Sequence, residues 1–302
     1  MEQTAQRQWQ GKTDGAPWMH RALISMFKVV PLPVMYFFMS FAIPYYLIAH
    51  GKARKAIYHY FRKHLGCSPL AASLHTIANH YVFGAIVMDK FASYAGVKFK
   101  VEVENMNIFK DLASSDKGFL MLTAHVGNSE ICGYSLVAPK RMNVLAYGGE
   151  AETISRNRSR VLTSNNIRLI PTDEDMEYLF VIRNALEDGE ILSLHADRVF
   201  GSNKTVDADL LGSPAELPFG PFAISAMGDV QAITVFVVKK SLHRYKIFID
   251  RVKSGSADAS IGDKVAVMAQ SYCDNLGKVF LKNSPETLEA QGTGLRGPSA
   301  TR

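Results

Sequence analysis

Hydrophobic residues in the last two thirds of this chain follow the patterns of β-strands. Lys98–Glu104 and Tyr245–Val252 alternate apolar and polar residues with a period of two, which predicts half-buried strands. Short continuous apolar runs predict strands buried on both faces. These runs are Gly118–Ala124, Met142–Tyr147, Ile167–Ile170, Glu190–His195 and Ala232–Val238.

The segments between these strands have the periodicity and end signals of helices. We expect helices over Ser129–Val137, 150–162, 174–187 and Asp263–Leu281. Strands that alternate with helices predict an α/β fold, in which a central, mostly parallel sheet is flanked by helices.

The N-terminal third is more apolar. Residues 21–66 predict one or two helices, and residues 68–94 predict another. Residues 29–49 contain no charge, and about 20 apolar residues span a bilayer. Three prolines within this run, Pro31, Pro33 and Pro44, would kink a helix. The favoured interpretation is a hydrophobic membrane-anchoring helix that either spans the bilayer or enters it partly; a buried core helix is the alternative.

Charge separates this segment from the rest of the chain. The net charge is +6, and no acidic residue occurs between Asp14 and Asp89. Seven cations lie in that stretch, namely Arg21, Lys28, Lys52, Arg54, Lys55, Arg62 and Lys63. Next to an apolar run, they favour anionic lipid over nucleic acid as the partner. The denser cluster follows the run, which predicts that the next domain faces the cytoplasm.

These patterns divide the chain into three parts. Residues 1–66 are expected to form the anchor with its basic helix, residues 67–288 the α/β domain, and residues 289–302 a flexible tail. The three cysteines are far apart and form no metal-binding pattern. The chain has no P-loop, no GxGxxG and no GxSxG motif, so nucleotide binding and serine hydrolysis are not predicted.

The sharpest chemical feature is the stretch LTAHVGNSE, residues 122–130. An apolar strand leads directly into His125, and Gly127 permits a tight turn. Asn128 or Ser129 can cap the next helix, which places Glu130 in its first turn. His125 therefore lies at the carboxyl end of a strand, where open α/β sheets build their sites. Glu130 can hold one imidazole nitrogen while the other accepts a proton. The alternative is that His125 ends a strand and Glu130 favours the helix dipole.

Other groups give weaker signals. His195 and Asp197 end another predicted strand and would lie on the same rim, either in a site or as a loop pair. Arg156, Arg158 and Arg160 would bind phosphate or line a solvated helix face.

Several ordered blocks together resemble the bacterial lipid A biosynthesis acyltransferases, within the wider lysophospholipid acyltransferase superfamily. They are the hydrophobic anchor, the HxxxxE motif of His125 and Glu130, Asn184–Arg198, Leu210–Ala223 and Gln231–Val238. Within the block Asn184–Arg198, Asp197 stands at the family aspartate. It is followed by Arg198 where the family often has Gln or His. The family also has an arginine between the motif and this aspartate, for which Arg156, Arg158, Arg160 and Arg168 compete.

The resemblance implies transfer of a fatty acyl chain from an acyl carrier protein thioester to a hydroxyl or amine of a lipid acceptor, such as a lipid A-like glycolipid or a polyene lipid. His125 would be the general base and Glu130 its partner. Arg158, Arg160, Asp197 and Arg198 would contact substrate. Neither metal nor cofactor would be needed beyond the acyl donor, and no nucleic acid is expected. The implied location is the bacterial inner membrane. The alternatives are an acyl-CoA-dependent lysophospholipid or glycerophosphate acyltransferase, and a non-catalytic membrane lipid-binding protein.

Overall fold

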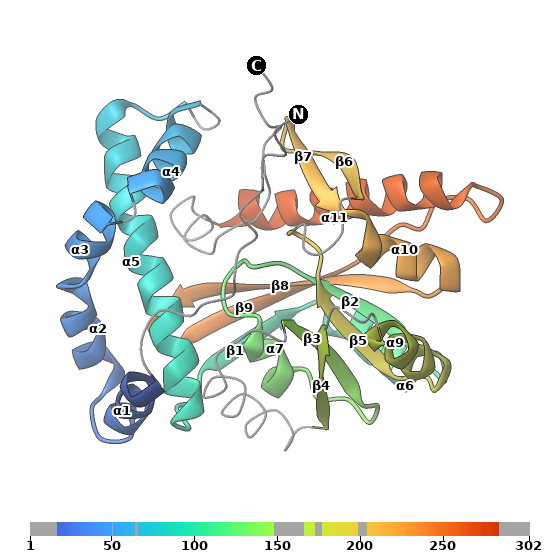
Figure 1. The fold of residues 1–302 in the computed structure, drawn as a ribbon, viewed down its shortest axis with the longest axis horizontal. Coiled ribbons are helices and arrows are strands. Elements are labelled where there is room, and N and C mark those ends of the chain that lie inside the picture. The colour runs from blue at the N-terminus through green and yellow to red at the C-terminus, as the bar shows by residue number, and fades with distance from the viewer. Residues whose placement is uncertain are drawn as a thin grey trace, which may run out of the picture.

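The computed structural model describes residues 17–49, 51–63, 66–147, 166–172, 177–198 and 204–283. In this part of the chain seven strands form one sheet in the order β1-β9-β8-β2-β5-β3-β4 (Figure 1). Neighbouring strands run parallel except for the antiparallel pair β8 and β9. The strands are β1 Lys100–Glu104, β2 Phe119–Thr123, β3 Met142–Tyr147, β4 Ile167–Thr172, β5 Ile191–His195, β8 Ala232–Ser241 and β9 Arg244–Arg251. The α/β fold predicted from the sequence is confirmed.

Helices cover both faces of the sheet. Residues that alternate along β2 pack into opposite layers, because successive side chains of a strand point to opposite faces. Phe119 and Met121 contact one layer, and Leu120 and Leu122 contact the other. The first layer includes α5 Pro69–Tyr94, α6 Met106–Ser114 and α7 Glu130–Ser135. The second includes α9 Tyr178–Glu187, α10 Phe219–Gly228 and α11 Ile261–Lys282.

Three elements of the fold were not predicted. Two are α6 and α10. The third is the antiparallel hairpin of β6 Thr205–Leu210 and β7 Ser213–Pro218. Its turn is Leu211-Gly212, and both residues have positive φ, at 55° and 80°. A tight turn of this kind usually carries Asn-Gly or Asp-Gly, so Leu211-Gly212 is a weak signal for a hairpin. The predicted helix over 150–162 and the tail 289–302 lie outside the described residues.

The uncharged run 29–49 forms two helices, not one. They are α2 Leu32–Ser40 and α3 Ile43–Ala49, with a bend of 43° between them. Pro31 caps α2 and Pro33 lies in its first turn, where proline is tolerated. Met35 and Met39 face the core, whereas Phe37, Phe38 and Phe41 are more than half exposed. The predicted kink is therefore present, and this segment is part core and part surface.

Four N-terminal helices, α1 Pro17–Phe27, α2, α3 and α4 Gly51–Lys63, pack along α5 at one side of the sheet (Figure 1). Close approach of α2 to α5 depends on Gly84, where an added Cβ would lie 2.8 Å from the sulfur of Met39. By length and apolar composition alone, α5 and the bent pair α2–α3 are possible membrane spans in the described chain. The long apolar helix is thus α5, which follows the segment predicted to be the anchor.

A buried ion pair joins this helical layer to the sheet. Asp89 of α5 is fully buried and accepts hydrogen bonds from Lys239 of β8, Tyr36 of α2 and Tyr245 of β9. Elements from three parts of the sequence therefore meet at one carboxylate. Because each buried charge needs its partner, this cluster fixes how α2 and α5 lie on the sheet.

We expect Lys239→Met to lower the free energy of unfolding by roughly 3 to 5 kcal/mol, because it leaves the Asp89 carboxylate buried without its cation. Chemical denaturation followed by circular dichroism measures this loss. The matched control is Lys240→Met at the next, exposed position, with an expected loss below about 1 kcal/mol. Equal losses in the two variants would contradict this account of the ion pair.

Candidate functional site

The register of the two central strands brings His125 and Asp197 together. Strands β2 and β5 are parallel neighbours, and Thr123 at the end of β2 pairs with His195 at the end of β5. His125 comes two residues after Thr123, and Asp197 comes two residues after His195. The backbone N–H of Ala196 donates to the carbonyl of Thr123 at 3.0 Å, which extends the pairing into the loops. Two residues 72 positions apart therefore share one rim of the sheet.

Asp197 holds His125 at two points. Its Oδ1 lies 2.8 Å from the imidazole Nδ1, and its Oδ2 accepts the backbone N–H of His125 at 2.9 Å. The Asp197 side chain is 0% exposed, whereas that of His125 is 34% exposed. Burial raises the pKa of Asp197, but the hydrogen bonds from His125 and the charges of His125 and His195 outweigh it and hold this pKa below its usual value. Asp197 is therefore an ionised carboxylate facing a half-exposed imidazole.

The pairing with Asp197 sets the proton arrangement of His125. A carboxylate at Nδ1 accepts a proton from that nitrogen, which leaves the lone pair on Nε2. The partly exposed ring can then accept a proton from a bound molecule. This is the arrangement of a general base with an orienting carboxylate.

His195 completes the cluster around His125. The two imidazole rings stack with centroids 4.1 Å apart and planes inclined by 25°. The Nδ1 of His195 lies 3.0 Å from the hydroxyl of Thr123, and that hydroxyl also donates to the carbonyl of Leu194 at 3.2 Å. From the sequence, His195 and Asp197 were a rim pair with no assigned contact to His125. The available signal was that His125 and Asp197 each lie just beyond the end of a predicted parallel strand.

The described contacts of Glu130 join it to the helical layer. It begins α7, and its carboxylate pairs with Lys90 at 2.9 Å and accepts the hydroxyl of Tyr94 at 2.7 Å. Both partners belong to α5. Nδ1 of His125, one of the two imidazole nitrogens that Glu130 could hold, is held by Asp197. Direct pairing of Glu130 with His125 stays a prediction, and the described bonds show Glu130 joining the loop after β2 to the helical layer.

The predicted substrate-binding arginines are only partly described. Arg158 and Arg160 lie outside the described residues. Arg198 directly follows Asp197 and is exposed. Arg168 is exposed on β4, the strand at the edge of the sheet. Substrate binding by any of these arginines stays a prediction.

The loop between His125 and Glu130 holds one further polar group. Asn128 is 4% exposed, and its side-chain nitrogen has no hydrogen-bond partner among the described residues. A buried donor without a partner costs about 1 to 3 kcal/mol, and such groups occur at functional sites. From the sequence, Asn128 was expected only as a possible cap of the next helix.

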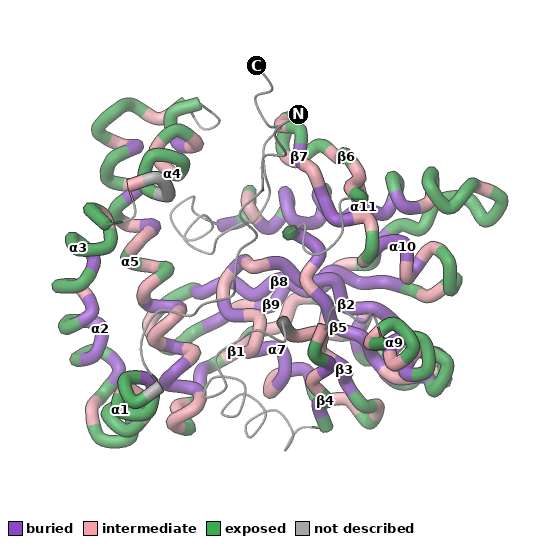
Figure 2. The backbone as a smooth tube through the Cα atoms, in the orientation of Figure 1, coloured by how far each residue is buried: buried purple, intermediate pink, exposed green. Residues whose placement is uncertain are grey.

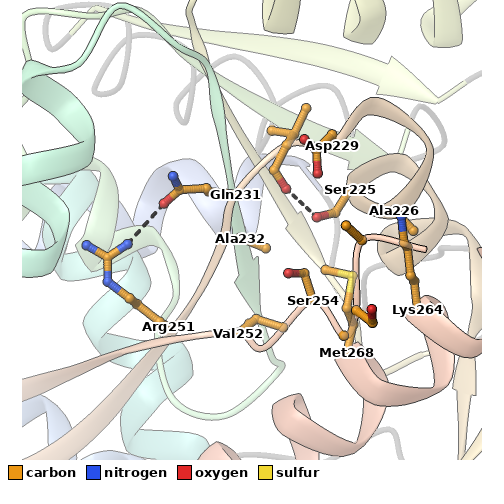
Figure 3. Close-up of a pocket in the computed structure, with 14 residues that line it drawn as sticks. Ser225, Ala226, Asp229, Gln231, Ala232, Arg251, Val252, Ser254, Lys264 and Met268 are labelled. Carbon is orange, nitrogen blue, oxygen red and sulfur yellow. Dashed lines mark hydrogen bonds between the residues drawn. The ribbon is translucent and has the colours of Figure 1, made fainter. Parts of the chain in front are cut away.

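A cavity lies at the end of the parallel strands opposite to His125 and Asp197. Figure 3 shows the residues that line it. Its volume is about 360 Å³, and it is lined by the start of β8, the end of β9 and parts of α10 and α11. Arg251 at this cavity is bound to Gln231 at 3.0 Å. Because β8 runs parallel to β2, the start of β8 lies away from the strand ends that carry His125 and Asp197. This cavity is therefore separate from the cluster of His125, His195 and Asp197.

Comparison with known protein families agrees with this geometry. The model of the family described as bacterial lipid A biosynthesis acyltransferase matches residues 71–285, more than half of the chain. The chain belongs to this family. A search of the curated proteins finds no match. The matched region contains His125, Glu130 and Asp197, together with all seven strands of the sheet.

The protein is thus an acyltransferase with a lipid acceptor. The resemblance drawn from the ordered sequence blocks is confirmed. The match begins within α5, so helices α1 to α4 lie outside the region that the family model matches.

Proposed function

We propose that this acyltransferase moves a fatty acyl chain from an acyl carrier protein thioester to a hydroxyl or amine of a membrane lipid, with His125 as general base. The observation that supports this most is the contact of 2.8 Å between Nδ1 of His125 and the buried carboxylate of Asp197. The acyltransferase family supplies the reaction class. The acceptor is a lipid A-like glycolipid or a related lipid.

In this mechanism Nε2 of His125 takes the proton from the acceptor hydroxyl as its oxygen attacks the thioester carbonyl. The tetrahedral intermediate then collapses, the carbon–sulfur bond breaks, and the thiolate takes the proton from His125. The products are the acylated lipid and the free thiol. Direct attack requires neither an acyl-enzyme nor a nucleophilic Ser or Cys, and we propose no metal or nucleotide cofactor.

Asp197 acts through His125 in this scheme. It fixes the ring with its proton on Nδ1 and stabilises the imidazolium that forms during attack. Asn128 lies in the same loop as His125, and its buried side-chain donor is suited to stabilise the negative charge of the tetrahedral intermediate. Glu130 secures that loop to α5 through Lys90 and Tyr94.

The N-terminal helices provide the proposed membrane contact. Exposed aromatic and aliphatic side chains cover α2 and α3, including Phe37, Phe38, Phe41, Tyr45 and Ile48. Figure 2 shows exposed stretches over these helices and buried central strands. Exposed cations lie nearby in the sequence, namely Lys28, Arg54, Lys55, Arg62 and Lys63. An apolar surface bordered by cations fits an anionic bilayer. A site tied to this layer through α5 would receive its lipid from the membrane.

Replacing Phe37, Phe38 and Phe41 together by serine is expected to weaken vesicle binding by more than tenfold, because three large apolar surfaces leave the lipid. Co-sedimentation of the full chain with vesicles that contain anionic lipid measures the binding. Phe180→Ser is the control, since Phe180 is 73% exposed on α9, a helix outside the N-terminal layer. Equal binding of the triple variant and the wild type would exclude this surface as the membrane contact.

Deletion of the gene, followed by mass spectrometry of extracted lipids, tests the whole proposal. We expect one lipid class to lose one acyl mass and to regain it with the wild-type gene. Purified protein then distinguishes the donors, and transfer should be faster from acyl carrier protein than from acyl-CoA. A preference for acyl-CoA would favour a lysophospholipid-type acyltransferase. Lipid binding without transfer for every acceptor would favour a non-catalytic lipid-binding protein.

A further inference from the structure

The residues around His125 form a possible set of metal ligands. His125, His195 and Asp197 each offer one ligand atom, and these atoms lie within 4.8 Å of one another. In a tetrahedral zinc site with bonds near 2.0 to 2.2 Å, ligand atoms lie roughly 3.3 Å apart. Nδ1 of His125 and Oδ1 of Asp197 lie 2.8 Å apart across a hydrogen bond, so this pair would lose its shared proton and separate slightly to bind one ion. Because both imidazoles are partly exposed, modest ring movements would close the cluster around an ion from solvent.

The donor types select the kind of ion. Two imidazole nitrogens and one carboxylate oxygen suit Zn²⁺ and its neighbours Co²⁺, Ni²⁺ and Cu²⁺, whereas Mg²⁺ and Ca²⁺ prefer all-oxygen sites. Three protein ligands with an open fourth position are also the usual composition of exchangeable zinc sites in enzymes.

Hydrogen bonds already orient two of the three ligands. The hydroxyl of Thr123 donates to the carbonyl of Leu194 and therefore accepts from Nδ1 of His195, at 3.0 Å. A proton on Nδ1 puts the lone pair of His195 on Nε2. Oδ2 of Asp197 accepts the backbone N–H of His125, while Oδ1 faces the imidazole. Such outer partners are typical of metal-binding histidines and carboxylates.

We propose that His125, His195 and Asp197 bind a transition-metal dication, with Zn²⁺ best suited, and that the bound ion stops acyl transfer. The inhibitory part rests on the role of His125 proposed above. If the ion binds Nε2, it occupies the lone pair that accepts the proton. If it binds Nδ1, the ring proton must move to Nε2, and the lone pair is lost there too. Either geometry therefore removes the base.

Binding is tested without reference to activity. The full-length enzyme in detergent, freed of metal with a chelator, is titrated with Co²⁺ and followed by visible absorption, with Zn²⁺ as competitor. We expect one tightly bound ion per chain. His195→Phe keeps a flat ring beside His125 but lacks a ligand nitrogen, and it should bind at least tenfold more weakly. His59→Ala, at an exposed histidine of α4, should bind as the wild type does. Equal affinity in all three proteins would overturn the site.

Inhibition is measured in the same preparations. Zn²⁺ should abolish acyl transfer by the wild type, and a chelator should restore it. Relative to its own metal-free rate, His195→Phe should need at least tenfold more Zn²⁺ for half inhibition. Tight binding that leaves transfer unchanged would overturn the inhibitory role. A wild-type protein that binds Co²⁺ but transfers no acyl chain would instead contradict the proposed function, while the metal site would stand.

Discussion

Replacement of His125 by alanine is expected to lower the rate of acyl transfer by about 10²- to 10⁴-fold, the usual contribution of a general base. The acceptor hydroxyl would keep its proton during attack, because no other group is proposed to take it. The loss should fall on kcat more than on KM, since the imidazole acts on the reacting proton. Purified protein with acyl carrier protein thioester and lipid acceptor gives both constants.

A second variant distinguishes loss of the general base from loss of folding. His125→Ala also leaves the buried carboxylate of Asp197 without its side-chain partner. His125→Asn retains an amide donor near the place of Nδ1 and has no basic nitrogen, so it should fold like the wild type and be equally slow. An active His125→Asn enzyme with native thermal stability would exclude His125 as the base.

Asp197→Asn is expected to lower kcat by a similar factor, about 10²- to 10⁴-fold, with a smaller change in KM. An amide at this position no longer stabilises the imidazolium, and it can present its N–H₂ group to Nδ1 and so favour the wrong imidazole tautomer. The backbone N–H of His125 can still donate to the amide oxygen, so the loop should keep its place. Steady-state kinetics together with a thermal melt measure both effects.

Glu130→Gln is the matched comparison, because both variants convert a carboxylate into an amide of the same shape. The described bonds of Glu130 go to Lys90 and Tyr94, so its substitution should lower kcat at least tenfold less than Asp197→Asn does. The reverse order of the two losses would show that Glu130 is the catalytic carboxylate and Asp197 a supporting one.

The apolar patterns located most of the sheet, because local hydrophobic order is enough to identify buried strands. Met142–Tyr147 was predicted with its observed limits as β3. The runs predicted for β2 and β5 contain the observed strands and extend one residue beyond them at one or both ends. The hairpin of β6 and β7 was missed because its Leu211-Gly212 turn has an unusual composition. Helix α6 was missed although its buried residues Phe109, Leu112 and Ala113 follow helical spacing, because it is only 9 residues long.

The N-terminal segment shows what residue composition alone cannot predict. An uncharged run of 29–49 has the length of one membrane span, but a bend of 43° just before Pro44 divides it into α2 and α3. Which side of α2 is buried depends on its neighbours. Tyr36 points to Asp89, a partner 53 residues later, whereas Phe37 beside it is exposed. A contact over this distance depends on how α2 and α5 pack.

The sequence by itself determined the α/β class, the position of His125 at the end of a strand and, through its ordered blocks, the acyltransferase family. Only the tertiary structure showed that the carboxylate of Asp197 holds His125. Sequence spacing pointed to Glu130, five residues away, because proximity along the chain is all that spacing measures. The parallel register of β2 and β5 brings Asp197 to the imidazole from 72 residues away. Strand pairing is set by packing across the whole domain, and no local pattern records it.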